Sequence, residues 1–231
     1  MKIIFAAFTS IFLMVGLIGF SQNTNEPYFI YQKGAKIKIG HFTKMNIPTS
    51  FTVYTITDVV KTDTMNYLTL KVETLDKYQK FVMSKDFSAS YFDGEIDIDK
   101  LFLIPIDSLP EIPQSDIDVM GRNFIIPSFL GDGIELSAAW VEVKIDSTSS
   151  VKVSEYSRVV DAFEKITTDI GDFDACLISS KLERKFGDVE LFTVYTWYSK
   201  GIGPVRTNYY NLKRKLVKYS EVVEIYIPKE S

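Results

Sequence analysis

Two glycines near the end of the chain, Gly201 and Gly203, are the first candidates for chemistry, because a glycine-rich loop can hold phosphate. A dinucleotide-binding loop needs a third glycine and a following helix, but Pro204 and Val205 follow here and open another run of alternating apolar and polar residues. The P-loop pattern ending in Gly-Lys-Ser or Gly-Lys-Thr is also missing. The spacing therefore predicts a tight turn between two strands, in which glycine supplies the positive φ angle.

A nucleophile with its base would have to come from the single histidine, His41, and the single cysteine, Cys176. Cys176 stands in an apolar run typical of a buried strand, where a thiol packs as a small apolar group. One histidine cannot build a multi-histidine zinc site, and the Gly-x-Ser-x-Gly motif of serine hydrolases is absent. We therefore predict no catalytic residues and a protein that is not an enzyme.

The acidic run from Asp93 to Asp99 invites a calcium interpretation, because calcium prefers several carboxylates. An EF-hand loop has glycine at its sixth position and glutamate at its twelfth, whereas Gly94 is second in this run. Strand alternation instead places the acids on one solvated face and Ile96 and Ile98 on the other. We predict no metal site and no cofactor; a carboxylate pair of the glycosidase kind stays open among the 30 acidic residues.

Charge constrains the possible partners. The chain has a formal net charge of −4 at pH 7, which argues against a nucleic-acid partner, since such proteins present a basic face. A short basic cluster, Lys213 to Lys215, is predicted to lie in the last hairpin turn, where charge keeps a sheet edge soluble. A contact between this cluster and a lipid headgroup or another polyanion is the alternative.

The first 22 residues have the form of a secretory signal peptide: Lys2, an almost wholly apolar stretch from Ile3 to Phe20, and then small and polar residues. We expect cleavage near Ser21 or Gln22, with no retained membrane span; a retained anchor is the alternative. No cysteine lies at this site, so the lipoprotein signal is missing. The sequence predicts a periplasmic or secreted protein in which residues 23–231 form a single β domain.

The elements that must position these residues are mostly strands, because alternation of apolar and polar residues dominates the chain. Short turns separate them, which favours antiparallel pairing. We predict an all-β fold, a curved antiparallel sheet or an open or half barrel of about ten to twelve strands. The expected strands are Lys36–Ile39, Ser50–Val60, Asn66–Leu75, Tyr78–Met83, Phe87–Phe92, Ile134–Ile145, Val151–Val160, Ala175–Leu182, Val189–Tyr198, Val205–Asn211 and Leu216–Ile227.

Three other stretches do not fit this pattern. Asp97–Leu103 and Asp161–Thr167 are expected to form short helices or turns. Ile104–Pro127 combines apolar residues with several prolines, which suit a central strand poorly. It is too apolar for a domain linker, so we expect an irregular, proline-rich crossover packed over the sheet. Its prolines are Pro105, Pro110, Pro113 and Pro127.

Several stretches taken together resemble a family of secreted β proteins of Gram-negative bacteria, a domain of unknown function with a TapB-like label. They are an aromatic-rich opening at Tyr28–Ala35, the segment Met120–Ser128, and Gly171–Cys176 followed by Trp197–Arg206. The family pattern differs at Ala175, ahead of the cysteine. The resemblance implies a curved antiparallel sheet or open barrel, akin in shape to periplasmic lipoprotein carriers, with no assigned catalytic residues.

We predict a non-enzymatic, extracytoplasmic protein whose sheet presents an apolar surface to a lipid or another hydrophobic ligand. An envelope structural or interaction module that pairs through a sheet edge is an alternative, and a carboxylate-based hydrolase of surface polysaccharide is another. The candidate ligand-facing or motif residues come from the crossover and from the glycine turn with its preceding strand. They are Phe124, Ile126, Phe129, Trp197, Tyr198, Gly201 and Gly203.

Overall fold

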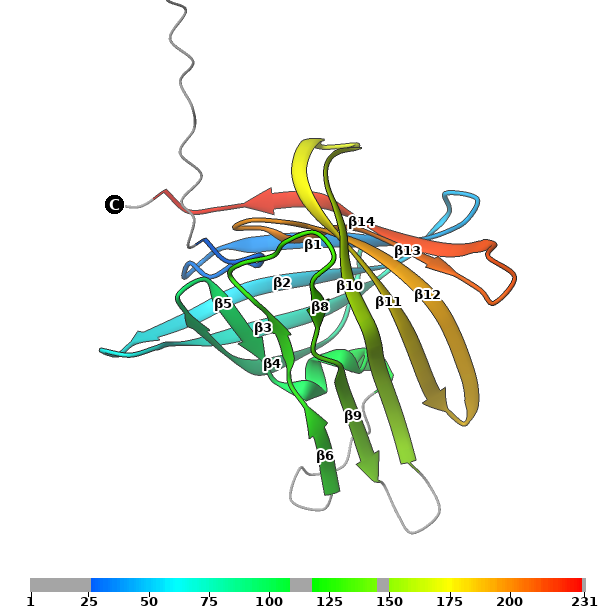
Figure 1. The fold of residues 1–231 in the computed structure, drawn as a ribbon, viewed down its shortest axis with the longest axis horizontal. Helices are drawn as coiled ribbons and strands as arrows, with labels where there is room; N and C mark the ends of the chain where they lie inside the picture. Colours follow the sequence, from blue (N-terminus) through cyan, green and yellow to red (C-terminus); the bar gives the residue numbers. More distant parts are fainter. Residues whose placement is uncertain (1–25, 109–117, 145–149, 230–231) are drawn as a thin grey trace, which may run out of the picture.

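The structure is a computed structural model that describes residues 26–108, 118–144 and 150–229 (Figure 1). The expected signal peptide at 1–22 and its cleavage site lie outside the described residues. Within the described ranges, no helix has the length and apolar character needed to span a bilayer.

The described chain is almost entirely β, with a single 14-stranded antiparallel sheet and two short 3-10 helices. Inward and outward side chains alternate along much of the sheet, as the apolar periodicity predicted, with interruptions at bulges such as those in β10. The elements are β1 (Lys36–Thr43), β2 (Pro48–Lys61), β3 (Asn66–Asp76), β4 (Phe81–Phe92), β5 (Glu95–Ile98), η1 (Lys100–Leu103), η2 (Ile106–Ser108), β6 (Asp118–Arg122), β7 (Phe124–Ile126), β8 (Glu135–Leu136), β9 (Ala139–Lys144), β10 (Ser150–Thr168), β11 (Gly171–Phe186), β12 (Asp188–Ser199), β13 (Gly203–Tyr210) and β14 (Leu216–Tyr226).

The sheet curls into a nearly closed barrel (Figure 1). Its order is β6-β9-β10-β11-β12-β13-β14-β1-β2-β3-β4-β5-β7, and β8 pairs with β10 beside this path. The two end strands, β6 and β7, are consecutive in the chain and separated only by Asn123. Because β6 pairs with β9 and β7 pairs with β5, one run of chain bridges both ends of the sheet.

This bridging run corrects the expected crossover. Ile104–Pro127 was predicted to be irregular throughout, yet Asp118–Arg122 and Phe124–Ile126 are strands. This part of the segment contains no proline, so its N–H groups remain available for the ladder. The strand count is accordingly higher than the predicted ten to twelve.

Two shorter predictions also need correction. Tyr78–Met83 and Phe87–Phe92 were expected to be separate strands, but Phe81–Phe92 is one continuous strand after a turn. Asp161–Thr167 was expected to be a turn or short helix and instead extends β10. Register shifts in β10 near Ser157 and after Val160 interrupt the alternation, which hides the strand in the sequence.

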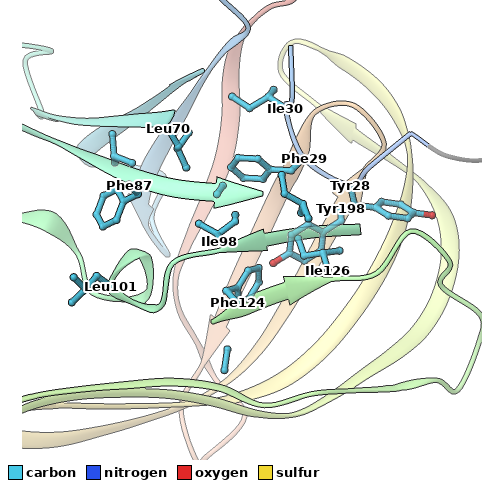
Figure 2. Close-up of a cluster of buried hydrophobic side chains, with 14 of the residues drawn as sticks. Tyr28, Phe29, Ile30, Leu70, Phe87, Ile98, Leu101, Phe124, Ile126 and Tyr198 are labelled. Carbon is cyan, nitrogen blue, oxygen red and sulfur yellow. The ribbon is translucent and has the colours of Figure 1, made fainter. Parts of the chain in front are cut away.

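The core lies inside the barrel, where inward-facing side chains pack together with the buried side chains of the N-terminal segment (Figure 2). This segment, Glu26–Gln32, packs on the β12–β13 turn at one end of the barrel. Tyr28, Phe29 and Ile30 are all buried. The Phe29 ring makes edge contacts with Tyr54 and Phe102, each at 6.2 Å between centroids. The aromatic-rich opening is therefore a plug for the barrel and forms no strand of its own.

Candidate functional site

The open end of the barrel contains a cavity of about 690 Å³ bounded by β1–β4, both 3-10 helices and β11–β14. A deeper cavity of about 150 Å³ shares the side chains of His41, Tyr54, Phe102 and Tyr209 with it and reaches Phe29. We call the two together the barrel hollow. A volume of several hundred Å³ is in the range of sites for small molecules.

The barrel hollow changes from apolar to polar toward its mouth, because several strands change the type of their inward residues there. On β1, Ile37 and Ile39 are followed two residues later by His41. On β11, Leu182 is followed by Arg184, and on β14 the inward position after Ser220 toward the turn is Lys218. The other apolar and aromatic lining residues include Phe42, Tyr54, Val72, Phe87, Phe102, Leu103, Ile104, Ile106 and Tyr209. The lining also contains two acids, Asp107 and Glu190, and several serine and threonine hydroxyls.

Two cations, Arg184 and Lys218, face this mouth without an ion-pair partner among the described residues. The Lys218 ammonium lies 5.0 Å from the ring centre of Phe192 and 5.3 Å from that of Tyr209, and the Arg184 guanidinium lies 5.8 Å from Tyr209. The Arg184 Nε is buried and has no hydrogen-bond partner. A positive group that is partly desolvated and unpaired favours an incoming anion.

Burial and the neighbouring Arg184 lower the pKa of Lys218, while Glu190 raises it. Glu190 stands opposite Arg184 in the β11–β12 register. These groups are therefore coupled, and an anion at the mouth would favour the charged form of Lys218.

His41 is the third polar group on this wall, and its Nε2 lies 2.8 Å from the Thr52 hydroxyl. Burial lowers its pKa to about 4, and the positive charges of Lys218 and Arg184 act in the same direction. The imidazole is therefore neutral at neutral pH.

Cys176 does not meet His41. It lines a different cavity of about 550 Å³ near Tyr28 and Ser199, at the plugged end of the barrel. Burial raises the pKa of its thiol to about 12, so the reactive thiolate is disfavoured.

The acidic run is only partly solvated. Ile96 and Ile98 are fully buried, as the alternation predicted, and Glu95 is exposed. Asp97 is half-buried, and Asp99 accepts a hydrogen bond from the Leu101 N–H at 2.8 Å and caps η1. Among the residues that the structure describes, no three His, Cys, Asp or Glu side chains lie close enough together to hold a metal ion.

The glycine turn is the predicted strand–turn–strand corner between β12 and β13. Gly201 and Gly203 have φ angles of 69° and 110°. A Cβ atom on Gly203 would lie 3.0 Å from the ring of Phe29, and the Gly201 N–H donates to the Pro27 carbonyl at 2.7 Å. Glycine is needed here because the N-terminal plug packs directly on the turn.

The other predicted site residues divide between the interior and the surface. Phe124 and Tyr198 are buried and line the deeper cavity, and Ile126 is buried in the same core (Figure 2). Phe129 is 77% exposed. The Trp197 indole N–H donates to the Glu164 carboxylate at 2.6 Å, away from the hollow.

Sequence reasoning missed the mouth residues His41, Arg184 and Lys218 as a group. A signal was present in the sequence. Lys218 lies two residues from Ser220, and Arg184 lies two residues from Leu182, so the members of each pair face the same side of their strand. This alternation alone did not show that β1, β11 and β14 contribute to the same wall of the barrel.

Comparison with known proteins gives a family match over most of the chain. A family model described as DUF3108-like matches residues 32–222. A search of curated proteins gave no match. The match agrees with a domain of unknown function, whereas the TapB-like label is not confirmed.

Two solved structures share the fold. One is assigned as an exported protein with a YmcC-like fold from Bacteroides fragilis NCTC 9343, with a TM-score of 0.73 and 19% identity over 87% of this chain and 100% of that one. The other is assigned as a lipoprotein from Parabacteroides distasonis ATCC 8503, with a TM-score of 0.69 and 18% identity over 87% of this chain and 99% of that one. At these identities the likeness shows the barrel fold.

Proposed function

This chain belongs to the DUF3108-like family, and we propose that it is an extracytoplasmic, non-enzymatic binding protein for an amphipathic ligand. The apolar part of the ligand occupies the barrel hollow, and an anionic group lies at the mouth. The apolar N-terminal stretch of the sequence and the assignments of the two structural relatives as an exported protein and a lipoprotein support an extracytoplasmic location.

The observation that carries the proposal is the polarity gradient of the barrel hollow. Its deep part is walled by Phe29, Phe124, Leu182 and Val194. Its mouth holds Arg184 and Lys218, neither of which forms an ion pair within the described chain, although the acids Asp107 and Glu190 line the same cavity. An acyl or other apolar chain with a carboxylate or phosphate end matches this order, since apolar surface leaves water and the anion meets two cations.

The chemistry of the wall supports binding over catalysis. His41 bonds to a hydroxyl, and its lowered pKa makes it a weak base at neutral pH. The thiol of Cys176 belongs to another cavity and has a raised pKa. The proposal therefore assigns no nucleophile–base pair to His41 and Cys176, which line different cavities.

Titration with a dansyl-labelled fatty acid tests the function. We expect saturable binding with a blue-shifted emission, and displacement by unlabelled fatty acid. The double variant Arg184→Gln/Lys218→Gln should bind at least about tenfold more weakly, because each cation makes a charge-assisted contact. A dansyl-labelled fatty alcohol should bind both proteins alike.

The matched control is Lys61→Gln/Lys165→Gln, which removes two exposed cations at the plugged end. It should bind the dansyl-labelled fatty acid as the unmodified protein does. No saturable binding by the unmodified protein, or equal binding of acid and alcohol in every variant, would contradict the proposal.

A further inference from the structure

Two turns lie side by side at the mouth of the barrel, the β1–β2 turn and the β13–β14 turn. The Lys44 N–H donates to the Val217 carbonyl at 3.3 Å, and the Tyr219 hydroxyl donates to the Asn46 side chain. The turn that joins β13 to β14 forms the orange-red end at the right of Figure 1. We call residues 44–47 and 211–217 the mouth rim.

The mouth rim exposes large apolar side chains at its tips. Met45 is 69% exposed and Leu212 is 77% exposed, and Ile47 is 52% exposed beside them. Such side chains at adjacent turn tips differ from the scattered apolar residues of an ordinary surface and indicate an interaction site.

The mouth rim is also basic. Its charged residues are Lys44, Lys213, Arg214 and Lys215, all exposed, and it contains no aspartate or glutamate. The chain as a whole has a net charge of −4, so this is a local reversal of sign.

Two turns at the opposite end of the barrel carry acidic residues, whereas the mouth rim has none. The β4–β5 turn has Asp93 and Glu95, and the β10–β11 turn has Asp169 and Asp172, all exposed. An anionic surface would therefore attract the mouth rim and repel these two turns.

Side-chain hydrogen bonds hold both tips in place. The Thr43 hydroxyl accepts from the Met45 and Ile47 N–H groups, each at 3.3 Å. The Asn211 side chain accepts from the Lys213 and Lys215 N–H groups, each at 3.0 Å. Preformed turns lose little conformational entropy when they bind.

We propose that the mouth rim docks the protein on the surface of an anionic phospholipid bilayer. Met45 and Leu212 enter the headgroup region, and the four basic side chains lie beside the lipid phosphates. Apolar tips flanked by lysine and arginine are the combination that interfacial binding uses, since both the apolar and the electrostatic contributions favour the surface.

Docking in this way would place the barrel mouth at the bilayer. Thr43 and Val217 belong to the rim strands and also line the mouth cavity. The inference goes beyond the proposed ligand and does not require it, because a barrel with an empty hollow presents the same rim.

Co-sedimentation with vesicles of phosphatidylcholine, with and without phosphatidylglycerol, tests the docking. We expect binding only when phosphatidylglycerol is present, and loss of binding at high salt. The variant Lys213→Gln/Arg214→Asn/Lys215→Gln should lower the partition coefficient about a hundredfold, since each basic residue contributes roughly a fivefold change. Asparagine is chosen at position 214 because Arg214 has a φ of 56°, which asparagine tolerates.

Met45→Ser/Leu212→Ser tests the apolar contribution and should weaken partitioning by about tenfold. The charge-matched control is Lys61→Gln/Lys165→Gln/Lys229→Gln, and the apolar control is Tyr67→Ser/Phe129→Ser, all at exposed positions away from the mouth rim. Both controls should bind vesicles as the unmodified protein does.

Three outcomes would overturn the inference. They are no binding to phosphatidylglycerol vesicles, equal loss in the rim variants and their controls, and retention on heparin without any vesicle binding, which would indicate a different polyanionic partner. Because these vesicles can be assayed without a fatty-acid ligand, failure here and failure of the fatty-acid titration are distinguishable.

Discussion

At the scale of the residue, His41 shows how its surroundings decide the role of a side chain. It is the only histidine, and it lies on the barrel wall with Thr52 as its hydrogen-bond partner. Burial and two nearby cations favour its neutral form. The residue that could have been a general base is therefore a packed polar group, and its titration affects stability more than reactivity.

The free energy of unfolding should fall when the pH drops below the pKa of an unfolded histidine. The folded pKa is about 4, so between pH of about 6.5 and about 4 the unfolded chain takes up a proton that the folded chain does not. This stabilisation by His41 is fully present above pH of about 6.5 and should decrease by about 3 kcal/mol as the pH falls across this window. Urea unfolding across the window measures it.

His41→Gln is the matched variant, because its amide can still bond to the Thr52 hydroxyl but does not titrate. Its stability should depend less on pH in this window than that of the unmodified protein. Identical pH profiles for the two proteins would show that His41 is not the responsible group.

At the scale of the element, the β6–β7 run decides whether the sheet closes. It is short, and a buried arginine from β10 supports it. Arg158 is 1% exposed and donates through one nitrogen to the carbonyls of Ile125 and Ser137, at 3.1 and 3.0 Å. Its guanidinium lies 4.4 Å from the ring centre of Phe124, and its Nε lies 3.8 Å from the Glu155 carboxylate.

Arg158→Ala should destabilise the protein by about 3 to 5 kcal/mol. The change removes the buried positive partner of the Glu155 carboxylate, and it leaves the Ile125 and Ser137 carbonyls without their hydrogen-bond donor. Arg158→Met preserves much of the volume, so it should lose less. Urea unfolding gives the stability, and amide hydrogen exchange at Phe124–Ile126 gives the local effect. A loss below about 1 kcal/mol, with unchanged exchange in β7, would exclude this role.

At the scale of the whole molecule, the barrel is plugged at one end and hollow at the other. The plug is the segment Glu26–Gln32, and the hollow reaches it at Phe29. Closure through β6 and β7 is partial: among the described residues, Phe81–Ser88 of β4 pairs along the sheet only with β3, and Asp161–Thr168 of β10 pairs only with β11, so the edge-pairing alternative stays open. This asymmetry, with the hollow and the basic mouth rim at the same end, gives the molecule a binding end.

Phe29→Ala should destabilise the protein by about 3 to 5 kcal/mol, because Phe29 is only 2% exposed and its removal leaves a cavity against Tyr54 and Phe102. The hollow should also become larger, so longer apolar ligands should compete better in the fatty-acid titration. Phe129→Ala is the control: its ring is 77% exposed, and the change should stay within about 0.5 kcal/mol. Equal effects of the two changes in urea unfolding would contradict the plug.

The sequence by itself determined the all-β class, the positions of most strands and the glycine turn at Gly201–Gly203. These are local properties: alternation repeats every second residue, and a turn depends on a few neighbouring backbone angles. The local signal failed where bulges interrupt the alternation, as in β10, and where two short strands lie between prolines, as at Asp118–Arg122 and Phe124–Ile126.

Only the tertiary structure decided which strands are neighbours, and therefore which side chains share the hollow. His41, Arg184 and Lys218 are far apart in the sequence and meet because β11–β14 continue into β1 around the barrel. The same ring joins the Lys44–Ile47 turn to the Asn211–Val217 segment. Periodicity sets the two faces of a strand, but strand order and register come from long-range pairing and packing, which no local pattern encodes.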